Sequence, residues 1–140
     1  MSAMDYQVIL YHKQATSART RFVKFEGETV FVNGVVDELS QIDASDGHKT
    51  LIHPAAVLRQ TEDQLGLATQ TLIAETEYRY SIEVPGGRIP VVLAGINTMD
   101  PPFAEIEQAG GRFIDLTQAR GLPVLELELL RHAYEMVLGG

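Results

Sequence analysis

The sequence contains no cysteine, which excludes disulfide bonds, thiolate metal sites and cysteine nucleophiles. Long hydrophobic runs are also missing, because no stretch approaches the ~20 apolar residues that a membrane-crossing helix needs. The opening Met-Ser-Ala-Met-Asp-Tyr has neither the charged region nor the apolar region of a secretory signal peptide. We therefore expect a cytoplasmic protein with no membrane partner.

Positive charge is scarce, since the 140 residues contain 11 Lys and Arg against 19 Asp and Glu, a net charge of -8. An acidic surface repels the phosphate backbone of nucleic acids and anionic lipid headgroups. The densest basic group, Arg19, Arg21 and Lys24, is too small for a nucleic-acid footprint. We expect Arg21 and Lys24 on the solvent face of a strand and predict no nucleic-acid partner.

Familiar catalytic and metal-binding motifs are missing as well. No serine lies in a Gly-x-Ser-x-Gly elbow, and no two histidines have the spacing of a zinc-binding helix. The four histidines are His12, His48, His53 and His132. We expect His132, in a largely apolar helix, to be a core or interface residue. The sequence thus predicts no metal and no other cofactor, identifies no catalytic residue and leaves open whether the protein is an enzyme.

What the sequence does contain fits one folded domain. A chain of 140 residues buries roughly two-thirds of the surface that its unfolded form exposes. Its hydrophobic content of 45% is ordinary for a globular protein. We expect a single α+β domain over residues 1–140, in which residues 1–70 and 71–140 form lobes that share one core.

Residues 77–96 predict a β-hairpin at the centre of a sheet. Apolar side chains occupy every second position from Tyr78 to Val84, which is typical of a strand with one buried face. Gly86 and Gly87 permit the positive φ that a tight reversal needs. Residues 91–93 (Val-Val-Leu) are apolar without alternation, as in a strand covered on both faces. We therefore place the second arm in the interior of the sheet.

The first half of the sequence contains short segments rich in β-branched and aromatic residues. These predicted strands are residues 6–11, 21–26 and 29–32. The last two are expected to pair as a hairpin around Gly27, and residues 37–42 are expected to be helical. A second helix is predicted from Pro54 to residue 65, where Gly66 ends it. Residues 67–75 fit either an extension of that helix or a lead into the next strand.

After the central hairpin, helix and strand signals alternate. Residues 103–109 have helical composition with Asp100 as the expected N-cap, and residues 113–116 are predicted to form a strand. The short connection matches a tight βαβ crossover, so we expect this strand to lie parallel to the central one. The predicted fold class is α+β, with a mixed, mostly antiparallel sheet built from two hairpins and a C-terminal β-α-β-α segment packed on it.

The last helix, predicted for residues 123–138, has apolar residues around more of its circumference than one buried face would cover. Its polar residues Glu128, Arg131 and Glu135 share one narrow face, where they can pair. Such a helix needs burial on two sides, either in a groove of its own domain or against a second copy of the chain. We therefore expect a protein of unidentified process that acts by association, as a homodimer through this helix.

The loop between Gly95 and Asp100 is the basis of the alternative function. It leaves the carboxyl end of a buried strand, where ligands collect in parallel-sheet proteins. The predicted ligand-binding residues are Asn97, Thr98, Asp100 and Asp115. Asp100 and Asp115 are also candidates for paired acid–base carboxylates, since both follow strands expected to be adjacent, although helix capping explains Asp100 as well. The alternative is therefore a small-ligand-binding protein or an enzyme that uses this loop.

Overall fold

The computed structural model describes residues 6–36, 40–43, 54–85 and 87–139. Within these residues the chain forms a seven-stranded sheet and three α-helices. The strands are β1 (Gln7–Lys13), β2 (Thr20–Phe25), β3 (Gln41–Asp43), β4 (Leu72–Ala74), β5 (Tyr80–Val84), β6 (Gly87–Ile96) and β7 (Gly111–Ile114). The helices are α1 (Pro54–Leu65), α2 (Phe103–Gln108) and α3 (Val124–Gly139), and a short 3-10 helix, η1, covers Leu116–Gln118.

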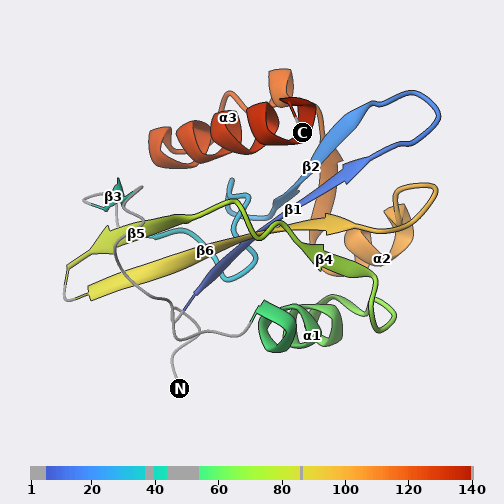
Figure 1. Ribbon diagram of the computed structural model, residues 1–140, viewed down its shortest axis with the longest axis horizontal. Coiled ribbons are helices and arrows are strands. Elements are labelled where there is room, and N and C mark those ends of the chain that lie inside the picture. The colour runs from blue at the N-terminus through green and yellow to red at the C-terminus, as the bar shows by residue number, and fades with distance from the viewer. Residues whose placement is uncertain (1–5, 37–39, 44–53, 86, 140) are drawn as a thin grey trace.

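The sheet has the strand order β3-β5-β6-β1-β2-β7, with β4 beside the second half of β6 (Figure 1). Strands β1 and β6 are parallel, and the other pairings among the described strands are antiparallel. The predicted α+β class, with a mixed, mostly antiparallel sheet and a C-terminal β-α-β-α segment, is confirmed. Strand β1 from the first half of the chain lies directly beside β6 from the second half.

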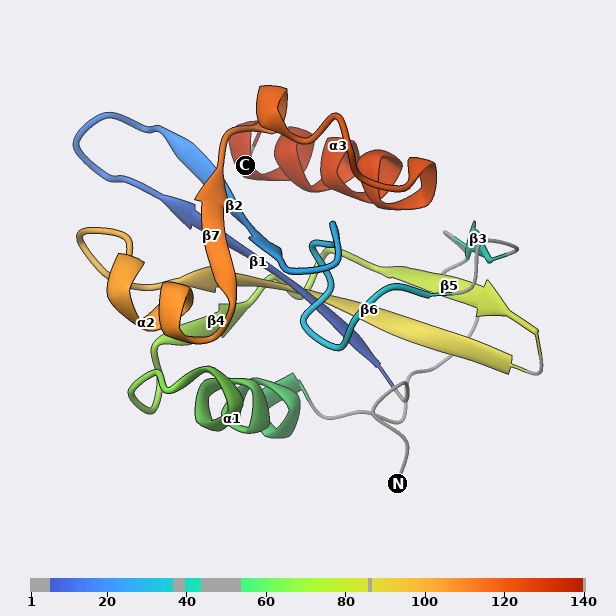
Figure 2. The same ribbon diagram turned by 180° about the vertical axis from the view of Figure 1, so that it is seen from behind.

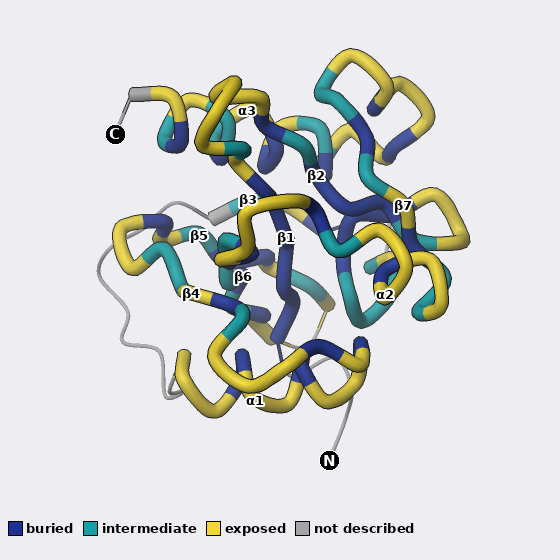
Figure 3. Tube along the Cα trace, turned by 90° about the vertical axis from the view of Figure 1, so that its right-hand side faces the viewer, coloured by how far each residue is buried: buried dark blue, intermediate teal, exposed yellow. Residues whose placement is uncertain are grey.

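The sheet is the middle layer between helices. Helix α3 lies over one face, while α1 and α2 lie over the other (Figures 1 and 2). Side chains of β6 alternate between the faces, so that Val91 and Leu93 pack toward α3 and Val92 packs toward α1 and α2. Strand β1 is buried along almost its whole length (Figure 3). The prediction that residues 91–93 are covered on both faces is therefore confirmed.

The first hairpin is formed by β1 and β2, and the predicted pairing of residues 21–26 with residues 29–32 is wrong. A single β-bridge at Thr29 follows the turn, but no strand continues from it. A buried carboxylate explains the difference. Glu126 of α3 accepts hydrogen bonds from the Thr29 hydroxyl (2.7 Å) and from the Val30 amide (2.8 Å), so this amide needs no strand partner.

The predicted helix at residues 37–42 is wrong in the part that the structure describes. Residues 41–43 form β3, which pairs antiparallel with β5. Ile42 lies opposite Ile82, and an apolar cross-strand pair of this kind stabilises a strand. Residues 37–39 lie outside the described residues.

Helix α1 begins at Pro54 and ends at Leu65, as predicted. Gly66 follows with a φ of 72°, the left-handed conformation that ends a helix. Residues 67–75 do not extend α1. They lead instead into β4, which pairs with the second half of β6.

Strand β7 runs in the same direction as β6, as predicted, but it is not adjacent to β6. Strands β1 and β2 lie between them, because the β1–β2 hairpin occupies the place beside β6. Strands that follow one another in the sequence are neighbours in the sheet in roughly two-thirds of cases. The pair β6 and β7 is an exception. The expectation that Asp100 and Asp115 follow adjacent strands is therefore wrong.

Asp100 is not the N-cap of α2, contrary to the prediction. The N-cap is Pro102, and no side chain caps this helix. Asp100 belongs instead to a tight turn, in which the Thr98 hydroxyl donates to the Asp100 carbonyl oxygen at 2.6 Å. The two prolines at 101 and 102 separate this turn from the first helical residue.

Helix α3 packs on the sheet through one stripe of buried residues. These are Glu126, Leu129, Leu130, Ala133 and Val137. The half-buried residues on either side of the stripe are Leu125, Leu127, Tyr134 and Met136. The helix therefore lies partly in a groove of its own domain, one of the two predicted arrangements. Glu128, Arg131 and Glu135 point outward, and within the described chain no ion pair joins these three.

None of the helices in the described part of the chain is long and apolar enough to cross a bilayer.

Candidate functional site

The carboxyl ends of the parallel strands β1 and β6 lie at one edge of the sheet, and polar side chains gather there. The ring of His12 is fully buried, with Nε2 2.8 Å from the Thr98 carbonyl oxygen. Beyond the end of β1, Gln14 donates from Nε2 to the Asp100 carboxylate at 3.4 Å. The loop that follows β6 is therefore tied to the end of β1 by both backbone and side-chain contacts.

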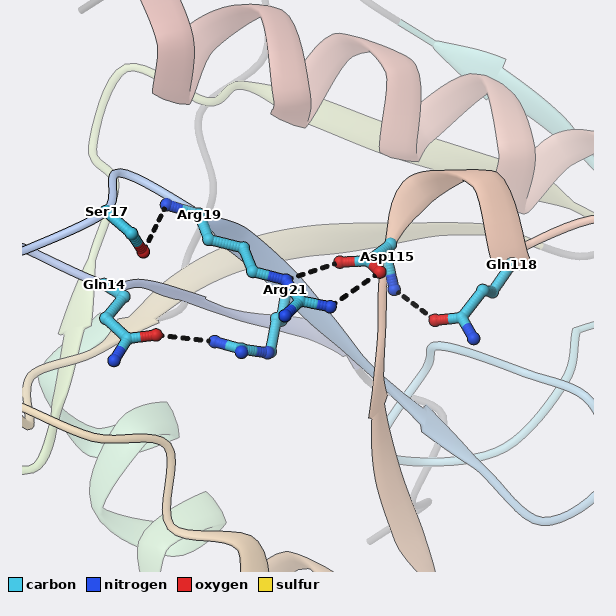
Figure 4. Close-up of polar contacts among 6 residues, drawn as sticks. All are labelled: Gln14, Ser17, Arg19, Arg21, Asp115 and Gln118. Carbon is cyan, nitrogen blue, oxygen red and sulfur yellow. Dashed lines mark hydrogen bonds and ion pairs between the residues drawn. The ribbon is translucent and has the colours of Figure 1, made fainter.

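Asp115 follows β7 and lies at the same edge, where it forms a bidentate ion pair with Arg19 (Figure 4). Arg19 donates from Nε at 3.1 Å and from Nη2 at 2.8 Å. The Asp115 backbone amide donates a hydrogen bond to Gln118 Oε1 at 2.8 Å, which is part of the capping box of η1. The hydrogen bonds from Arg19 lower the pKa of Asp115 from its ordinary value, and the charges of Arg19 and Arg21 act in the same direction.

Arg21 contacts the first of these groups through Gln14. It donates from Nη1 to Gln14 Oε1 at 3.0 Å (Figure 4), and its guanidinium carbon lies 5.9 Å from the centre of the Phe103 ring. Phe103 also meets Phe113 edge-to-face, with ring centres 5.4 Å apart, yet it remains 56% exposed. Among the described residues, no carboxylate forms an ion pair with Arg21. A positive charge and an aromatic ring are thus held together at the surface.

The four predicted ligand-binding residues do not converge on one pocket. Asn97, Thr98 and Asp100 share an exposed loop, whereas Asp115 lies beyond β1 and β2 and is bound to Arg19. The Asn97 amide donates to the Thr71 carbonyl oxygen at 2.7 Å, and the Thr98 hydroxyl is used within its own turn. Gln14 joins the loop to Arg21, which acts on Asp115 through its charge.

Sequence reasoning missed Gln14 and His12 because it did not predict that β1 pairs with β6. It also placed Arg21 and Lys24 on one solvent face, which is wrong. Residues three apart in a strand point to opposite faces, and Lys24 is 8% exposed and pairs with Glu28 at 2.5 Å. The alternation of side chains along a strand is the sequence signal that places Arg21 and Lys24 on opposite faces.

The histidines give no sign of a metal centre in the described chain. Within it, no group of three or more His, Cys, Asp or Glu side chains is arranged to hold a metal ion. His132 is half-buried and stacks on Tyr80, with ring centres 4.7 Å apart, and its Nδ1 lies 4.0 Å from Glu135 Oε1. His12 Nδ1 is buried without a hydrogen-bond partner among the described residues. His48 and His53 lie outside them.

A surface hollow of about 430 Å³ lies at another place, where the turn after β2 meets the turn between α2 and β7. Its lining residues are Lys24, Phe25, Glu26, Glu28, Glu107, Gly110, Gly111 and Arg112. None of the four predicted ligand-binding residues lines this hollow.

The chemistry that the edge at loop 97–100 offers is binding. Arg21 supplies positive charge, while Phe103 and Met99 supply exposed apolar surface. In the described residues of this edge, no serine or threonine hydroxyl is hydrogen-bonded to a base that would activate it. No protein-family model matches the chain, and no curated protein matches it.

Proposed function

We propose that the protein acts by association and that its partner is a second copy of the chain, bound through α3. The observation that carries this proposal is the apolar surface left on α3 after it has packed on the sheet. Val124 is 79% exposed and Leu138 is 52% exposed, while Leu127 and Tyr134 are half-buried. Apolar side chains that remain exposed to water along one helix favour burial against a partner.

The same four residues follow one side of the helix. Positions three, four and seven apart in a helix share a face, and this relation links 124 with 127, 127 with 134 and 134 with 138. The 16 residues of α3 span about 24 Å at 1.5 Å per residue. A helix of that length is long enough to form the centre of an interface that buries about 800 Å² on each partner.

Sedimentation velocity of charged variants tests this proposal. Val124→Glu and Leu138→Glu place a carboxylate in the interface, so each should weaken dimerisation about tenfold or more. Met99→Glu and Ile73→Glu are matched controls, because their side chains are 79% and 52% exposed but lie elsewhere, and they should leave dimerisation unchanged. Leu129 is unsuitable for this test because it is fully buried against the sheet. Equal effects in all four variants would contradict the proposal.

A second candidate function is the binding of a small, negatively charged ligand at the loop of residues 95–100. It is supported by Arg21, which has no carboxylate partner in the described chain and lies beside the exposed Phe103 ring. A thermal-shift screen with metabolites that carry carboxylate or phosphate groups tests it, since a ligand at ~100 times its dissociation constant adds about 2.7 kcal/mol of stability. Arg21→Gln should abolish such a shift, whereas Arg59→Gln on α1 should not. A shift that survives Arg21→Gln would exclude this site.

The cytoplasmic location expected from the sequence also belongs to this proposal. Cell fractionation with an antibody against the protein tests it. Recovery with the soluble cytoplasmic fraction is the expected result, and recovery outside the cytoplasm would contradict it.

A further inference from the structure

The turn at Asn33 and Gly34 is a place where the chain can react with itself. In an Asn-Gly pair, the glycine nitrogen can attack the carbonyl carbon of the asparagine side chain, because glycine has no side chain to obstruct the approach. The chain has one other asparagine, Asn97, which is followed by the β-branched Thr98. Asn33 is therefore the asparagine whose sequence most favours deamidation.

The folded chain holds both reacting groups of this pair in hydrogen bonds. The Asn33 side chain donates from Nδ2 to the Tyr6 carbonyl oxygen at 3.0 Å, directly before β1. The Gly34 N–H must lose its proton before its nitrogen can attack, and it donates to the Phe31 carbonyl oxygen at 3.1 Å. Both groups have to leave these partners before the reaction can begin.

Gln7 of β1 fixes the backbone on both sides of the same turn. Its side chain is fully buried, with Oε1 accepting from the Asn33 backbone amide at 3.2 Å and Nε2 donating to the Gly34 carbonyl oxygen at 2.8 Å. The Val32 amide also donates to the Val8 carbonyl oxygen, at 3.1 Å. Because these contacts all join the turn to β1, the Asn-Gly pair is released when the turn separates from that strand.

We infer that Asn33 is a modification site that the fold protects, and that it deamidates when residues 31–34 separate from β1. In the reaction, the Gly34 nitrogen loses its proton to solvent and bonds to Asn33 Cγ, while the Cγ–Nδ2 bond breaks and ammonia leaves. Water then opens the succinimide ring. Breakage of the new bond between Cγ and the Gly34 nitrogen gives aspartate, and breakage of the original backbone bond between the two residues gives isoaspartate.

Neither product can restore the original contacts. Aspartate at position 33 has no donor for the Tyr6 carbonyl oxygen and places a carboxylate oxygen near it. Isoaspartate adds a methylene group to the backbone between the two groups that Gln7 bonds, the amide of residue 33 and the Gly34 carbonyl. Deamidation therefore makes an opening of this turn permanent.

Peptide mapping by mass spectrometry after incubation in mildly alkaline buffer tests the inference, because it distinguishes asparagine, aspartate and isoaspartate at each position. Deamidation of Asn33 should be about tenfold or more slower in the folded protein than in the same chain unfolded in urea, since the opened fraction is the one that reacts. Asn97 is the internal control and should react slowly in both states. Equal rates at Asn33 in the two states, or an Asn33 that stays unmodified in urea, would overturn the inference.

Gln7→Leu tests whether the contacts with β1 provide the protection. Leucine is of similar size but makes neither hydrogen bond, so the turn should open more often and Asn33 should deamidate about tenfold or more faster in the folded protein. Thr61→Val on α1 is the matched control. It removes a buried hydroxyl that donates to the Val57 carbonyl oxygen, and it should leave the rate at Asn33 unchanged. An unchanged rate in folded Gln7→Leu would overturn the inference.

Asn33→Asp reproduces one product directly, so this test does not require Gln7→Leu to fold. It should unfold at a lower urea concentration than the unmutated protein, because the Tyr6 carbonyl oxygen loses its donor. Asn97→Asp changes an exposed residue in the same way and should leave the urea midpoint unchanged. Equal midpoints for Asn33→Asp and the unmutated protein would show that the modified turn keeps its place beside β1, which would overturn the inference.

Discussion

At the scale of single residues, Glu126 connects two distant parts of the chain. Its carboxylate is buried and accepts hydrogen bonds from Thr29 and Val30, which fixes the segment after β2 against α3. Burial raises the pKa of Glu126 above its ordinary value of 4.5, although both hydrogen bonds act in the opposite direction. The stabilising contribution of a group with a raised pKa is complete below the ordinary value and is lost as pH rises through the raised one.

Two substitutions of Glu126 distinguish the loss of its hydrogen bonds from the loss of its ionisable carboxyl group. Glu126→Ala leaves the Thr29 hydroxyl proton and the Val30 amide buried without an acceptor, which should cost about 2–5 kcal/mol of unfolding free energy. Glu126→Gln keeps an acceptor but cannot ionise, so its stability should vary less between pH 4 and pH 8 than that of the unmutated protein. Urea unfolding at a series of pH values checks both. An unmutated protein whose stability follows the same pH profile as Glu126→Gln would contradict this role.

Gly95 is required because Tyr11 lies over it. A Cβ atom at Gly95 would approach the Tyr11 hydroxyl to 2.9 Å and Cζ to 3.0 Å, and this hydroxyl is fixed by a hydrogen bond to Glu75. Gly95→Ala should therefore displace Tyr11 and cost about 1–3 kcal/mol of stability. Gly87→Ala in the same strand is the matched control, since nothing lies within 4 Å of its Cβ position. Thermal unfolding of the two variants should differ clearly, and equal melting temperatures would show that Tyr11 moves aside freely.

At the scale of secondary-structure elements, the environment of α3 predicts a gradient of substitution effects. Leu129 is fully buried, whereas Leu125 is half-buried at the side of the same helix. Leu129→Ala should cost about 2–5 kcal/mol, and Leu125→Ala should cost clearly less because it removes less buried surface. Urea unfolding measures both values. Equal losses of unfolding free energy would mean that the buried residues of α3, Leu129 among them, do not hold the helix on the sheet.

The elements that could be predicted are those whose signals are local. The β5–β6 hairpin follows from the alternation of residues 78–84, and α1 follows from Pro54 at its start and Gly66 after its end. The errors lie where a distant contact decides the local structure. Residues 29–32 have the composition of a strand, but Glu126, almost a hundred residues later, takes the hydrogen bond that a strand partner would have taken. No pattern within residues 29–32 reveals that Glu126 takes the place of a strand partner.

At the scale of the whole molecule, the sequence located the loop after a buried strand but did not show which side chains from other strands reach that loop. The loop after β6 does leave a buried strand, as predicted. Gln14 and Arg21 reach that loop only because β1 pairs in parallel with β6 across about eighty residues of sequence, and β7 joins β2 instead of β6. Pairings between strands so far apart depend on the packing of the complete sheet, which periodicity in one segment does not specify.

The molecular mass of the unmutated protein in solution tests the proposed function most directly. Sedimentation equilibrium at several protein concentrations gives both the mass and the dissociation constant. We expect a mass of twice 15.4 kDa at high protein concentration. A single species of 15.4 kDa at every concentration would contradict association through α3.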